Sequence, residues 1–189
     1  MNENSDSRKN INQEESFEIL MKRTKELSVP VSEVKTEQEI LCCLNFSIQN
    51  TGYAISAEYI QSIISSFKIT SIPDIPDFIL GITDYRGRIL VIIDLHVFFN
   101  YSSTNISSDS NIILVSHDNS ECGILVDKVF DVHSIPVKSI GKNISTIEKN
   151  TSKYLSGMPR IEDKLFALID IPKIFESKKI KNLKDFSDT

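Results

Sequence analysis

Apolar and polar residues alternate in three stretches of the chain, and turn residues interrupt each alternation. The stretches are 40–56 with a turn at 50–52, 79–94 with a turn at 85–87, and 112–126 with a turn at 118–120. A period of two that is broken by short polar or glycine-containing turns is typical of β-hairpins. The pattern therefore predicts three antiparallel hairpins. The run Glu58–Ile64 is either a short helical turn or a further strand.

Helical spacing of apolar residues occurs near the N-terminus. The stripe within 14–27 has a period close to that of a helix, and Pro30 follows it. This predicts an amphipathic helix, which either docks on the rest of the chain or binds a partner. The expected organisation is an N-terminal extension over 1–38 with a disordered start, one β-rich domain over 39–176, and a charged C-terminal tail over 177–189.

One segment of the domain occurs twice in degenerate form. FILGITDYRGRILVIIDLHVFF at 78–99 matches YLSGMPRIEDKLFALIDIPKIF at 154–175 without a gap, at an offset of 157 − 81 = 76. The first hairpin matches the third at an offset of 113 − 44 = 69, which places an insertion in the polar connection 141–153. The repeat predicts two similar β-modules of about five strands each. Small closed barrels are expected, because closure removes exposed strand edges.

Each copy of the repeat ends in an aspartate, Asp94 or Asp170, that follows an apolar strand. An aspartate in this position can cap a short helix, which stabilises it by about 1 kcal/mol. Pro172 suits the first turn of such a helix, where its missing N–H group costs little. We expect caps here rather than catalytic acids, with the apolar residues that follow packing on the modules.

The composition excludes several classes of protein. The net charge is −5, which argues against a nucleic-acid-binding protein, and the sequence has no run of about 18 apolar residues that would insert into a membrane. The polar start MNENSDSRKN is unlike a signal peptide. The three cysteines, an odd number, suit reduced and mostly buried thiols. A cytoplasmic location is therefore expected.

Motifs of catalysis and of metal or cofactor binding are missing from the sequence. It has no Gly-rich nucleotide loop, no zinc-protease motif and no nucleophile elbow, and its three histidines are far apart. Asp74 and Asp77 flank a proline and suit a turn. Ser65 and Lys68 match S-x-x-K without its companion motifs, which leaves a hydrolase as an alternative. We expect a non-catalytic protein that requires neither metal nor cofactor.

Arg86 is the most unusual local feature, because it lies directly before the turn glycine of the second hairpin. Its planar guanidinium group carries five donors and would be held on a rigid turn. It is either a solvated loop cation or an anchor for an acidic or carbonyl group of a partner, since arginine is enriched in interface hot spots.

Three segments resemble the CheW family of chemotaxis coupling proteins, and the resemblance extends over about 40–176. They are FILGITDYRGRILVIIDL at 78–95, GILVDKVFDV at 123–132, and YLSG with LIDI at 154–157 and 168–171. The resemblance implies a mainly β fold of two intertwined five-stranded SH3-like barrels. It also implies an adaptor in two-component signal transduction that couples chemoreceptors to a CheA-type histidine kinase. Such an adaptor is cytoplasmic and is recruited to membrane-associated receptor arrays.

The resemblance also implies which residues bind partners, namely the kinase regulatory domain and the cytoplasmic tip of the chemoreceptor. The matching positions are Arg86, Gly87, Gly81, Ile82, Asp84 and Ile60. The chain departs from the family where Ser62 replaces glutamate, Val91 replaces proline and Asp84-Tyr85 replaces Asn-Leu. These departures suggest a divergent member that serves a particular receptor set. The alternative is a CheW-like scaffold of a twitching or developmental pathway.

Overall fold

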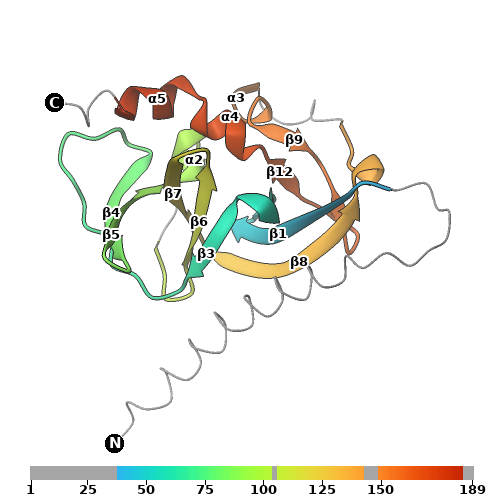
Figure 1. Ribbon diagram of the computed structural model, residues 1–189, viewed down its shortest axis with the longest axis horizontal. Coiled ribbons are helices and arrows are strands. Elements are labelled where there is room, and N and C mark those ends of the chain that lie inside the picture. The colour runs from blue at the N-terminus through green and yellow to red at the C-terminus, as the bar shows by residue number, and fades with distance from the viewer. Residues whose placement is uncertain (1–37, 104–105, 143–148, 185–189) are drawn as a thin grey trace, which may run out of the picture. The chain divides into compact units, whose positions relative to one another are not determined.

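The computed structural model of the protein describes residues 38–103, 106–142 and 149–184. Two five-stranded sheets make up most of this part (Figure 1). The first sheet has the order β8 (Lys128–Pro136), β1 (Ile40–Ile48), β2 (Thr51–Ser56), β12 (Ala167–Ile169) and β9 (Leu155–Gly157). The second has the order β3 (Ile60–Ile64), β6 (Asn111–His117), β7 (Ser120–Val126), β5 (Arg88–Ile93) and β4 (Ile79–Tyr85).

Short helices and one small hairpin connect these strands. The hairpin consists of β10 (Arg160–Ile161) and β11 (Lys164–Leu165). The helices are η1 (Ala57–Tyr59), α2 (Leu95–Phe98), η2 (Val137–Ser139), α3 (Lys149–Ser152), α4 (Ile171–Phe175) and α5 (Lys178–Lys184), of which η1 and η2 are 3₁₀ turns. The helix expected over 14–27 lies outside the described residues.

The three hairpins expected from the alternating pattern are confirmed. β1 pairs with β2, β4 with β5 and β6 with β7, all antiparallel. The ambiguous run at 58–64 contains both of its predicted elements, because the 3₁₀ turn η1 leads directly into β3. Local turn chemistry accounts for this success, since the residues that set each turn lie between the strands they join.

The two halves of the chain exchange strands. β1 and β2 share a sheet with β8, β9 and β12 from the second half, through the pairs β1–β8 and β2–β12. β6 and β7 share a sheet with β3, β4 and β5 from the first half, through the pairs β3–β6 and β5–β7. Counting strands along the sequence puts about five into each half, but each sheet draws its five from both halves. The modules are therefore intertwined, as the family resemblance implied.

The register of the strands confirms the internal repeat. At the offset of 76, the pairs Ile79–Ile93 and Gly81–Ile92 recur as Leu155–Ile169 and Gly157–Leu168. At the offset of 69, the pair Phe46–Val129 of the first sheet recurs as Val115–Ile60 of the second, with the two strands exchanged between halves. The two sheets are therefore copies of one pairing scheme.

The predicted fold class, mainly β with two five-stranded SH3-like units, is confirmed. In the described residues the hydrogen-bonded ladders do not close into barrels: the first ends at β8 and β9, and the second at β3 and β4. Each sheet curves around its own apolar core. One core contains Cys43, Ala54, Ile135, Ile161, Phe166 and Leu168, and the other contains Ile64, Leu90, Ile92, Ile112, Leu114 and Leu125.

Aromatic side chains join the two sheets around α2. The Phe98 ring lies 5.4 Å from Phe78 and 4.9 Å from Tyr154, and Phe99 stacks on Tyr154 at 5.8 Å, measured between ring centroids. The expected packing of Phe98, Phe99, Ile174 and Phe175 is confirmed, because all four are buried. Each contributes roughly 1.5–3 kcal/mol by burial.

Both predicted helix caps are present. The Asp94 carboxylate accepts hydrogen bonds from the N–H groups of His96 and Val97 at 2.8 and 3.3 Å, at the start of α2. The Asp170 carboxylate accepts one from the Lys173 N–H at 3.1 Å, at the start of α4. These contacts assign both aspartates a structural role.

The C-terminal segment differs from the expected charged tail, because 178–184 form the helix α5. Ile180 is buried, and the Lys179 ammonium donates hydrogen bonds to the Phe98 carbonyl and the Asn100 side-chain oxygen. The same ammonium lies 4.9 Å from the Phe98 ring centroid. The excess of lysines over apolar residues predicts a solvated tail, but the Lys179 side chain covers the aromatic surface of Phe78 and Phe98.

His96 predicts a loss of stability in mild acid. Its ring is buried, and its Nδ1 atom has no hydrogen-bond partner among the described residues. Burial lowers the pKa of the imidazole, although Asp94 and Asp127 oppose the shift. The unfolded chain, with a histidine pKa of about 6.5, therefore binds the proton first, so the free energy of unfolding decreases as pH falls below that value.

Urea titrations between pH 7.5 and 5 measure this slope. His96→Gln is expected to reduce the slope, whereas the control His133→Gln, at a partly exposed histidine, is expected to preserve it. An unchanged slope in His96→Gln would assign the acid sensitivity to other groups.

Candidate partner-binding hairpin

Arg86 and Gly87 form the two-residue turn between β4 and β5. Both have positive φ angles, 54° and 77°, and Tyr85 pairs with Arg88 across the turn. Two left-handed residues make the tight turn that suits a twisted hairpin, and glycine takes the second position without strain. The Gly87 N–H also donates to the Asp84 carboxylate at 3.4 Å. The backbone that carries Arg86 is therefore fixed.

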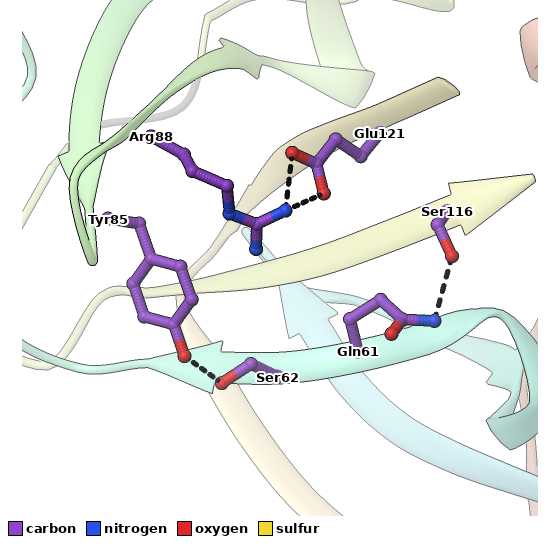
Figure 2. A network of polar contacts seen from close by, with 6 residues as sticks. All are labelled: Gln61, Ser62, Tyr85, Arg88, Ser116 and Glu121. Carbon is purple, nitrogen blue, oxygen red and sulfur yellow. Dashed lines mark hydrogen bonds and ion pairs between the residues drawn. The ribbon is translucent and has the colours of Figure 1, made fainter. Parts of the chain in front are cut away.

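The Tyr85 ring contacts the Arg86 side chain. The guanidinium carbon of Arg86 lies 5.0 Å from the centroid of the Tyr85 ring, within the range of a cation–π contact. The Tyr85 hydroxyl shares a hydrogen bond of 2.9 Å with the hydroxyl of Ser62 on β3, as Figure 2 shows. Because β3 and β4 are the two outer strands of the second sheet, this bond links the ends of a ladder that backbone pairing leaves open.

Arg88 is engaged in a different way from Arg86. Its Nη1 atom lies 3.0 Å from both carboxylate oxygens of Glu121 on β7 (Figure 2). Within the described residues no carboxylate lies within 4.0 Å of the Arg86 guanidinium, and Arg86 is exposed. The sequence has two arginines that flank Gly87, and the structure leaves Arg86 available for an outside partner.

Gly81 and Ile82 lie further along β4, against a neighbouring segment. Ile82 exchanges two backbone hydrogen bonds with Thr70, of 2.8 and 2.9 Å. Gly81 is buried with φ 139°, and a Cβ atom there would lie 2.1 Å from the Thr70 carbonyl oxygen. Gly81 thus permits a close backbone approach, so any influence it has on a partner is indirect.

Ile60, the remaining predicted site residue, begins β3 and pairs with Val115. Its exposed fraction is only 6%, so it supports the sheet more than it offers a contact surface. The structure therefore brings Arg86, Gly87 and Asp84 together at one exposed tip. Gly81 and Ile60 are buried and do not belong to that tip, and partner binding by all of these residues stays a prediction.

The repeat gives the Arg86 tip a counterpart of opposite charge. At the offset of 76, Arg86 and Gly87 correspond to Glu162 and Asp163, which turn between β10 and β11 with φ angles of 48° and 63°. The two tips share their backbone geometry and an exposed aliphatic residue nearby, Ile89 or Leu165. The basic group is therefore specific to the first copy.

The described residues offer little support for a catalytic site at Ser65 and Lys68. The Ser65 hydroxyl donates to the Asn111 side-chain oxygen at 2.7 Å, and Lys68 is exposed. Over 38–103, 106–142 and 149–184, no group of three or more His, Cys, Asp or Glu side chains is placed to hold a metal ion. In the same ranges no helix has the length and apolar character needed to cross a membrane.

The cysteines are placed as the sequence suggested, as free thiols that are mostly buried. Burial raises the pKa of the Cys43 thiol to about 11 and that of Cys122 to about 12. Thiols with a pKa this high contain little thiolate near neutral pH, so they are poor nucleophiles and metal ligands. Their place in the two sheets is that of small apolar residues.

Comparison with known proteins identifies relatives that agree with the observed fold. The chemotaxis protein CheW of Klebsiella aerogenes is 31% identical over 137 residues, which cover 72% of this chain and 82% of the relative. The crystal structure of the scaffolding protein TtCheW from Thermoanaerobacter tengcongensis superimposes with a TM-score of 0.65 at 29% identity, covering 75% and 96% of the two chains. The protein FrzA of Myxococcus xanthus is 25% identical over 109 residues, covering 58% and 66% of the two chains. The family model of the CheW-like domain matches residues 43–179, and the chain belongs to this family.

Proposed function

We propose that this chain is a non-catalytic adaptor that couples chemoreceptors to a CheA-type histidine kinase. Membership of the CheW-like domain family supports this, as do the similarity to a chemotaxis protein and to a scaffolding protein. The observation that carries the proposal is Arg86, an exposed cation on a tight hairpin turn that has no ion-pair partner among the described residues. Its receptor contact would be the cytoplasmic tip of a chemoreceptor.

The mechanism of such an adaptor is geometric. The receptor tip would contact the surface around Arg86, and an apolar face would contact the kinase regulatory domain. Ile89 and Val91 provide exposed apolar surface on β5, with 65% and 37% of their surface accessible. Because both contacts would belong to one rigid body, movement of the receptor would bias the kinase through a coupling free energy between two binding sites. The adaptor would then reside at cytoplasmic receptor arrays.

Arg86→Ala is expected to weaken binding of a receptor tip fragment by roughly 1–3 kcal/mol, as removal of a hot-spot arginine often does. The fold is expected to persist, because the Arg86 side chain is exposed. Isothermal titration with the fragment measures the loss, and thermal unfolding checks the fold.

Two matched variants test the specificity of that result. Glu162→Ala removes the charge at the repeat-related tip, and Arg88→Ala removes the neighbouring arginine that is paired with Glu121. Both are expected to change receptor binding less than Arg86→Ala does. Wild-type affinity in Arg86→Ala would contradict the proposed receptor contact.

An adaptor with this fold could also serve a different signalling pathway. The similarity to FrzA shows that proteins with names other than CheW match this chain. A CheW-like scaffold of a twitching or developmental pathway would bind the receptor and kinase of that pathway. Co-purification of the tagged chain, with identification of the kinase and receptor retained, distinguishes the two candidates.

A further inference from the structure

We propose that Tyr85, itself held by Ser62, positions the Arg86 guanidinium and so sets the affinity of this surface for an acidic or carbonyl-rich receptor segment. The inference rests on the proposed receptor contact of Arg86 and adds two residues to it. Tyr85 and Ser62 are positioning residues in this proposal, because neither needs to touch the partner.

The Tyr85 ring is fixed from two sides. It is half-buried and packs against the apolar core that contains Leu90 and Ile64, and its hydroxyl bonds to Ser62 on the opposite outer strand. A ring held by its body and by its polar end has little freedom to rotate. It therefore presents one constant face at the hairpin tip.

The Arg86 side chain lies over that face at 5.0 Å. An exposed arginine normally loses much rotamer freedom when a partner immobilises it, and this loss reduces its affinity. A cation–π contact with a fixed ring restricts the guanidinium before the partner binds. The guanidinium N–H groups stay available, because the described residues place no carboxylate within 4.0 Å of them.

Charge at the tip defines the class of partner. The Asp84 carboxylate is directed to the Gly87 N–H at 3.4 Å, and the Arg88 guanidinium is neutralised by Glu121. Arg86 is thus the cation at this tip without an ion-pair partner in the described residues. A planar guanidinium recognises a carboxylate or a pair of carbonyl oxygens by its fork of donors. The receptor segment that binds here should present such oxygens.

A purely structural role of the Ser62–Tyr85 bond would give a different result, since its loss would then affect folding and every partner equally. A double-mutant cycle between Tyr85 and Arg86 separates the two roles, because only positioning makes the effect of one residue depend on the other. The cycle uses the full chain and a receptor cytoplasmic tip fragment as the probe, with binding to the kinase regulatory domain measured in parallel.

Tyr85→Leu is expected to weaken receptor binding roughly three- to fivefold when Arg86 is present, as loss of a cation–π contact does. In the Arg86→Ala background the same substitution is expected to have an effect of less than about twofold, since nothing is left to position. Tyr85→Phe and Ser62→Ala each retain the aromatic ring but remove the hydrogen bond that holds it. Smaller losses of receptor affinity are therefore expected, and these losses should again depend on the presence of Arg86. Kinase binding should stay unchanged throughout.

Phe130→Leu is the matched control, because Lys128 lies 5.8 Å from this exposed ring on the other sheet. It is expected to leave receptor binding unchanged. If Phe130→Leu weakened receptor binding as much as Tyr85→Leu does, the effect would come from exposed aromatic area in general, and the proposal would be overturned. If Tyr85→Leu lowers the melting temperature, the double-mutant cycle with Arg86→Ala is measured with Tyr85→Phe and Ser62→Ala instead. Additive losses would overturn positioning and leave the receptor contact of Arg86 in place, whereas a wild-type chain that binds no receptor fragment would overturn both.

Discussion

Gly81→Ala is expected to lower the free energy of unfolding by about 3–4 kcal/mol, which is large for a single added methyl group. The new Cβ atom would lie 2.1 Å from the Thr70 carbonyl oxygen and 2.8 Å from its carbon, so the backbone of the Thr70 segment must move. The φ angle of 139° adds strain for any residue with a side chain. Urea unfolding monitored by circular dichroism measures the loss.

Alanine substitutions at two other glycines separate the steric clash from the backbone strain. At Gly157, the repeat counterpart, a Cβ atom would lie 2.4 Å from a side-chain methyl group of Ile140 and 3.2 Å from the Gly141 carbonyl oxygen. The backbone approach is less severe than at Gly81, so a cost of about 1–2 kcal/mol is expected. At Gly87 the φ angle is 77° but nothing lies within 4 Å, so only strain of about 1 kcal/mol is expected. Equal losses at all three positions would contradict the role assigned to the Thr70 carbonyl.

Asp94→Ala is expected to destabilise the protein by about 2–3 kcal/mol, because it leaves buried N–H donors without an acceptor. The aspartate is fully buried and accepts from the His96 and Val97 N–H groups and from the Ser103 hydroxyl. Asp94→Asn keeps one acceptor oxygen and is expected to recover part of the loss. Chemical unfolding of the three proteins under one set of conditions gives the comparison.

Asp170→Ala provides the matched comparison at the repeat counterpart. The Asp170 side chain is 19% exposed, caps α4 through one N–H group and forms an ion pair of 2.8 Å with the Lys173 ammonium. Water can replace its bonds in part, so a loss of about 1 kcal/mol is expected. A larger loss at Asp170 than at Asp94 would show that burial does not govern the strength of these caps.

Local features of the fold were predictable because their signals lie close together in the sequence. The turn at Arg86-Gly87 lies between the strands it joins, and Asp94 and Asp170 directly precede the helices they cap. The ungapped repeat also predicted a pairing scheme that is used twice, and the registers confirm it. In each case one short segment contains all of the chemistry.

The exchange of strands between the halves has no such local signal. Phe46 pairs with Val129, and nothing in the residues near either one identifies the other as its partner. A pattern of apolar positions gives the face that a strand buries, but it does not give the neighbour. The intertwining was therefore expected from the family resemblance alone.

The contacts within the candidate site were also beyond the sequence pattern. In the sequence Ser62 and Tyr85 are separate departures from the family pattern, 23 positions apart, and the structure joins them by a hydrogen bond of 2.9 Å. The pairing of Arg88 with Glu121 likewise depends on β5 lying next to β7. Contacts between side chains follow from strand order, which the alternating pattern leaves open.

The shared strands also bear on how the chain is made. As the ribosome releases the N-terminal third, the hairpin of β1 and β2 emerges with both of its flanking neighbours, β8 and β12, still untranslated. The edges of this hairpin are covered only after β8 and β12 have been made, so the first sheet is completed later than the second, whose five strands all lie within 60–126. In nascent chains stalled before β8, the β1–β2 hairpin should therefore be sensitive to proteases and dependent on chaperones, a vulnerability that a first sheet built from consecutive strands would avoid.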